Sequence, residues 1–88
     1  MGWAVKMYKA IHNGETKINI PVFEVHHRLY SAVMIPIAKS DDYLVSRFQE
    51  HKVRQELGET VEHAVGKCES WIKKTLWDNV TVIEEQSQ

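Results

Sequence analysis

The sequence predicts an α+β fold, in which a small antiparallel β-sheet of four to five strands is packed by one long amphipathic α-helix. The first half of the chain alternates apolar and polar side chains with a period of two, which indicates strands. Residues 60–76 instead repeat their apolar side chains at helical spacing. One long helix after a run of strands is typical of an antiparallel sheet covered on one face.

The first two predicted strands are joined by Asn13-Gly14, a dipeptide that tolerates the positive φ angles of a type I′ hairpin turn. In residues 3–12, one face carries Trp3, Val5, Met7 and Ile11, and the other carries Lys6, Tyr8 and His12. This alternation predicts a half-buried strand, with the apolar face in the core.

The return strand changes its apolar face at Pro21. Ile18 and Ile20 precede the proline on one face, whereas Phe23 and Val25 follow it on the other. Such a change of parity predicts a bulge or a strand break. Proline suits a break or an edge strand, because it has no N–H to donate to a neighbouring strand.

The next two segments are less regular. Residues 29–38 follow the polar connection at residues 26–28 and are apolar on both faces, which predicts a central strand covered on both sides. Residues 43–57 fit either a helix with a broken apolar stripe or a hairpin with strands at 43–48 and 53–57. We favour the hairpin, because β-favouring residues precede Ser46.

The helix at residues 60–76 is the clearest element. Gly58 interrupts the preceding segment, and Thr60 is a suitable N-cap, because its hydroxyl can accept a hydrogen bond from a first-turn N–H. Glu69 and Lys73 form an i, i+4 pair in the favourable order on the polar face. The apolar stripe consists of Val61, Ala64, Val65, Cys68, Trp71, Ile72 and Leu76. Beyond it, the β-branched residues 80–83 predict one more strand.

The length of 88 residues indicates one domain, assigned to residues 1–83, with a flexible C-terminal tail at 84–88. The net charge of −1, without a basic stripe, disfavours nucleic acid or an anionic membrane as the main partner. No apolar run approaches the roughly 20 residues of a membrane span. Cys68 is the one cysteine, and no secretory leader is recognisable, so we expect a cytoplasmic protein.

No catalytic, cofactor-binding or metal-ligating motif is recognisable, and we therefore expect a protein that is not an enzyme. The five histidines show no His-x-x-x-His spacing, and the four glycines are too scattered for a phosphate-binding loop. Cys68 lies on the apolar stripe, where a cysteine behaves as a small buried hydrophobe.

These observations favour a small regulatory or binding module whose partner is a protein, either a different one or a second copy. The candidate partner-binding residues are Trp77, Val80, Val82 and Ile83. They belong to a short terminal segment that can add to a sheet edge in the same chain or in another. The alternative is a sheet that stacks nucleic-acid bases on aromatic side chains. Its candidate residues are Tyr8, Arg28, Tyr30, Arg47 and Arg54.

The start of the helix resembles a stretch of HicB-like antitoxins with the pattern G-[DE]-T-x-E-[EH]-A. The matching residues are Gly58, Glu59, Thr60, Glu62 and Ala64. In that family a short β-meander precedes the helix, a short strand follows it, and members act by binding a small RNA-cleaving toxin. The resemblance therefore implies the same order of elements here and an antitoxin-like role.

Overall fold

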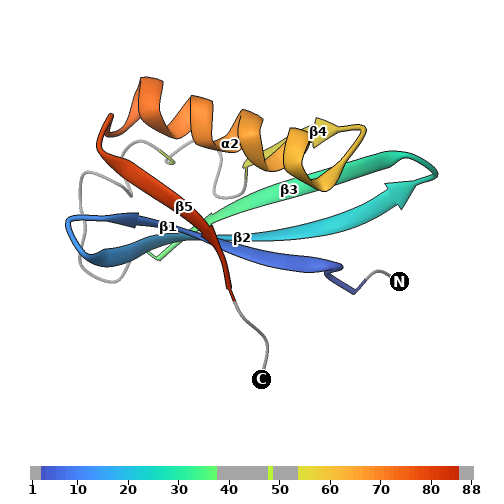
Figure 1. Ribbon diagram of the computed structural model, residues 1–88, viewed down its shortest axis with the longest axis horizontal. Coiled ribbons are helices and arrows are strands. Elements are labelled where there is room, and N and C mark those ends of the chain that lie inside the picture. Colours follow the sequence, from blue (N-terminus) through green and yellow to red (C-terminus); the bar gives the residue numbers. More distant parts are fainter. Residues whose placement is uncertain (1–2, 38–47, 49–53, 86–88) are drawn as a thin grey trace.

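The computed structural model describes residues 3–37, 48 and 54–85, and shows an antiparallel sheet of five strands with one helix across a single face (Figure 1). The elements are β1 (Lys6–His12), β2 (Glu15–His26), β3 (Leu29–Pro36), β4 (Arg54–Gly58), α2 (Val61–Thr75) and β5 (Val80–Glu84). Across the sheet the strands lie in the order β4-β3-β2-β1-β5. This architecture confirms the predicted α+β fold.

Two tight turns build the meander of β1, β2 and β3. Asn13 and Gly14 have φ angles of 54° and 79°, so the first turn has both positive angles expected of the predicted hairpin. The second turn lies between His26 and Leu29, which are paired, and Arg28 has a φ of 59° there. Both connections are short, and they place β2 in the middle of the sheet between its two neighbours in sequence.

Pro21 lies inside β2, and the predicted bulge or break at this position is wrong. The strand runs unbroken from Glu15 to His26, and Pro21 pairs with Met7 of β1. On the β3 side, the pairs Asn19–Ile35 and Val22–Ala32 keep one register, but Pro21 itself has no partner. Proline has no N–H to donate, so it interrupts the hydrogen-bond ladder between β2 and β3 at this position. The register of the two strands is the same before and after it.

The buried face of β1 is the opposite of the predicted one. Ala10 is fully buried and Tyr8 packs against the core, whereas Val5 and Met7 are 49% and 38% exposed. A period of two separates the two faces of a strand, but it does not show which face meets the helix. In this strand the more apolar face lies outside.

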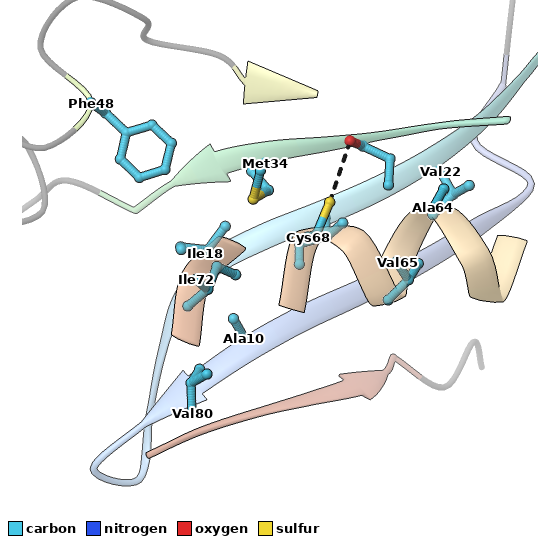
Figure 2. Packing of buried hydrophobic residues seen from close by; sticks show 12 residues of the cluster. Ala10, Ile18, Val22, Met34, Phe48, Ala64, Val65, Cys68, Ile72 and Val80 are labelled. Carbon is cyan, nitrogen blue, oxygen red and sulfur yellow. Dashed lines mark hydrogen bonds between the residues drawn. The ribbon is translucent and has the colours of Figure 1, made fainter. Parts of the chain in front are cut away.

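The core lies between α2 and the middle strands (Figure 2). The helix contributes Ala64, Val65, Cys68 and Ile72, all buried as predicted, whereas Val61 and Trp71 are only partly buried at its margin. The sheet contributes Ala10, Ile18, Ile20, Val22, Ala32, Met34 and Val80. In Figure 2, Cys68 points at β3, and its Sγ lies 3.6 Å from the carbonyl oxygen of Ala32.

The helix α2 covers only one side of β3, whereas the prediction was cover on both sides. Ala32 and Met34 are fully buried under the helix, whereas Ile35, on the other side of the strand, is 41% exposed. The apolar residues on that second side therefore lie on a face that α2 does not reach.

The predicted hairpin at residues 43–57 is observed in part. Arg54–Gly58 forms β4, which supports the strand reading of its second half. Of the first half, residues 43–47 lie outside the described residues, and Phe48 is a buried turn residue whose ring packs edge-on against Trp71 at 5.5 Å.

The C-terminal segment forms β5 and pairs with β1 of the same chain, as the predicted extra strand. The strand includes Glu84, and the N–H of Glu85 donates to the carbonyl of Met7 at 2.8 Å. Ordered pairing thus continues past residue 83, where the domain was expected to end. Residues 86–88 of the predicted tail lie outside the described residues.

The junction between β4 and α2 fixes the position of the helix. Thr60 is the N-cap, and its Oγ1 accepts a hydrogen bond from the N–H of His63 at 3.0 Å. Gly58 ends β4 so close to the helix that a Cβ atom on it would lie 2.5 Å from the backbone nitrogen of Ala64. Only a residue without a side chain fits there, because that contact is with backbone and cannot rotate away.

The two glycines of this region have opposite expected responses to alanine. Gly58→Ala is expected to lower the free energy of unfolding by about 1–3 kcal/mol, because it overpacks the junction. Gly66→Ala is expected to raise it by about 0.5–1 kcal/mol, because alanine is the better helix former and its Cβ meets nothing within 4 Å. Urea unfolding of both variants measures this, and a change of the same sign in both would contradict the described junction.

Candidate functional site

The candidate site is the face of the sheet that points away from α2, here called the open face. Strand alternation and the observed register assign its residues. They include Met7, Lys9, Ile11, Asn19, Pro21, Phe23, Ser31, Val33, Ile35, Gln55, Leu57, Thr81 and Ile83. Because a solvent-facing antiparallel sheet usually carries polar side chains, this apolar composition is unusual.

The apolar residues of the open face are neighbours across the strands. Met7 pairs with Pro21, and Phe23 lies two residues further along β2. Ser31 lies between Phe23 and Leu57, its partners on the two sides of β3. The apolar side chains therefore form one continuous area, the apolar patch, which consists of Met7, Pro21, Phe23, Val33 and Leu57.

The exposed hydrophobic surface is large for a chain of this size. Eight large hydrophobic residues are exposed by 38% to 86%: Trp3, Val5, Met7, Val25, Ile35, Ile37, Leu57 and Ile83. With ordinary residue areas, the four of these residues that lie on the open face expose roughly 300 Å² together, which is within the ~300–600 Å² of the largest apolar patch on a typical monomer. Met7, Ile35, Leu57 and Ile83 belong to the open face. Trp3, Val5 and Ile37 lie just beyond the ends of its strands.

The polar groups of the open face are few and largely neutral. Lys9 alone of the thirteen open-face residues named above carries a charge, and the exposed Glu85, whose N–H donates to the carbonyl of Met7 at 2.8 Å, adds an acidic side chain at the end of β5. Ser31 is 2% exposed, and its hydroxyl donates to Oε1 of Gln55 at 2.6 Å, so its polar group is already paired inside the patch. Removal of water from this area therefore leaves the serine hydroxyl satisfied and costs little.

The predicted partner-binding residues are divided between two environments. Val80 is buried, Val82 packs against the core, and Ile83 is exposed on the open face. Trp77 lies in the connection between α2 and β5, and its ring stacks on the ring of His12. The two ring centroids are 4.4 Å apart, and the angle between the ring planes is 12°. Of these four residues, the structure brings only Ile83 to the large exposed surface.

The four described residues of the nucleic-acid alternative do not form one exposed surface. Tyr8 and Tyr30 face α2 and pack against the core, and burial raises the pKa of Tyr8. Arg54 lies 4.5 Å above the Trp71 ring and pairs with Glu56 at 3.1 Å, whereas Arg28 lies in the distant β2–β3 turn. Arg47 lies outside the described residues.

A groove of about 560 Å³ runs along the exposed side of α2 beside β4. Its lining includes Glu56, Glu62, His63, Lys67, Ser70 and Trp71. The Nδ1 atom of His63 lies 3.4 Å from the N–H of Glu59, and so already has a backbone partner. Within the described part of the chain, no three histidine, cysteine or acidic side chains gather as metal ligands would, and no helix is long and apolar enough to cross a membrane.

Comparisons of the chain with protein-family models, with curated proteins and with solved structures return no match.

The open face was not predicted from the sequence, although three signals of it were present. Apolar side chains on that face account for all three signals. These are the change of parity at Pro21, the apolar alternation of residues 3–11, and the apolar residues on both sides of β3. Each signal was assigned to a bulge or to the core, because a single strand does not show how many helices cover its sheet.

Cys68 supplies a pH-dependent prediction. Burial raises the pKa of its thiol from 9.0 to about 12, with a smaller contribution from Glu56. The unfolded chain releases the thiol proton above about pH 9, while the folded chain keeps it. The free energy of unfolding should therefore fall as pH rises from 9 to 12, by at most about 1.4 kcal/mol per pH unit.

Urea unfolding at several pH values measures this slope, with Cys68→Ala as the control that removes this one titration. The variant should lose less stability than the parent over the same interval. Identical slopes for parent and variant would show that the thiol ionises equally in both states.

Proposed function

We propose that this chain is a non-enzymatic protein-binding module whose open face is the binding surface. The observation that carries the proposal is the apolar patch, which is continuous and uncharged, with Met7 and Leu57 exposed, Phe23 and Val33 half-buried and Pro21 buried. The largest apolar patch on a typical monomer measures ~300–600 Å² and is often functional.

An antitoxin-like role is the specific form of this proposal. It is supported by the resemblance at residues 58–64 and by the element order, with a meander before the helix and a short strand after it. In such a role the chain would act by covering a partner protein, and no catalytic group of its own would be needed. A cytoplasmic location belongs to the same proposal, and the single cysteine is compatible with it.

Nucleic acid is the less supported partner. Base stacking needs exposed aromatic rings beside a basic surface, whereas Tyr8 and Tyr30 are turned toward the helix. The open face offers Lys9 as its one cation. Binding to phosphates would weaken steeply with salt, whereas binding through the apolar patch should persist.

Met7→Glu is the variant that tests the proposal, because it places a charge beside Pro21 in the apolar patch. The matched control is Ser70→Glu, which adds the same charge at an exposed position on α2. We expect immobilised parent and Ser70→Glu to retain the same partner from a host lysate at high salt. Met7→Glu should lose it while its circular dichroism spectrum stays that of the parent.

Equal retention by all three proteins would contradict binding through the open face. Retention that disappears at high salt for parent and control alike would favour a charged surface, such as nucleic acid, as the partner.

A further inference from the structure

We draw no further inference here: the strongest candidate, the groove of about 560 Å³ along α2 beside β4, is lined by acidic and basic side chains alike, and nothing in the structure shows what would occupy it.

Discussion

The contact between Gly58 and the backbone of Ala64 determines the arrangement of the other elements. It leaves no room for a side chain at the end of β4, and Thr60 caps the helix two residues later. The chain therefore passes from strand to helix almost without a loop, and α2 lies across one face of the sheet (Figure 1). From that position Cys68 and Ile72 reach the middle strands, and the core forms on this side alone.

One helix covers one face, but the strands carry apolar residues on both. The helix-facing set, such as Ile20 and Met34, is fully buried, while Met7 and Leu57 on the opposite face remain exposed. A small domain buries a limited fraction of its surface, so this exposed apolar area is available for association. The proposed protein binding through the open face would remove from water the apolar surface that α2 does not cover.

The motif that resembles the antitoxin family has a structural explanation in this chain. Gly58 permits the close approach, Thr60 caps the helix, and Ala64 is a fully buried residue small enough for the contact. These residues define how a helix follows a strand, and they lie on the opposite side of the sheet from the open face. The resemblance thus concerns the scaffold, whereas the proposed binding surface consists of other residues, such as Phe23 and Val33.

The sequence by itself determined the elements whose signals are local: the helix capped by Thr60, the Asn13-Gly14 hairpin and the last strand. Capping, φ preferences and side-chain periodicity act within a few residues and need no knowledge of the rest of the chain. Only the tertiary structure decided which face of each strand is buried, since that depends on contacts such as Cys68 with Ala32, far apart in sequence. The place of Pro21 inside a central strand, and with it the open face, were for this reason beyond the reach of the sequence pattern.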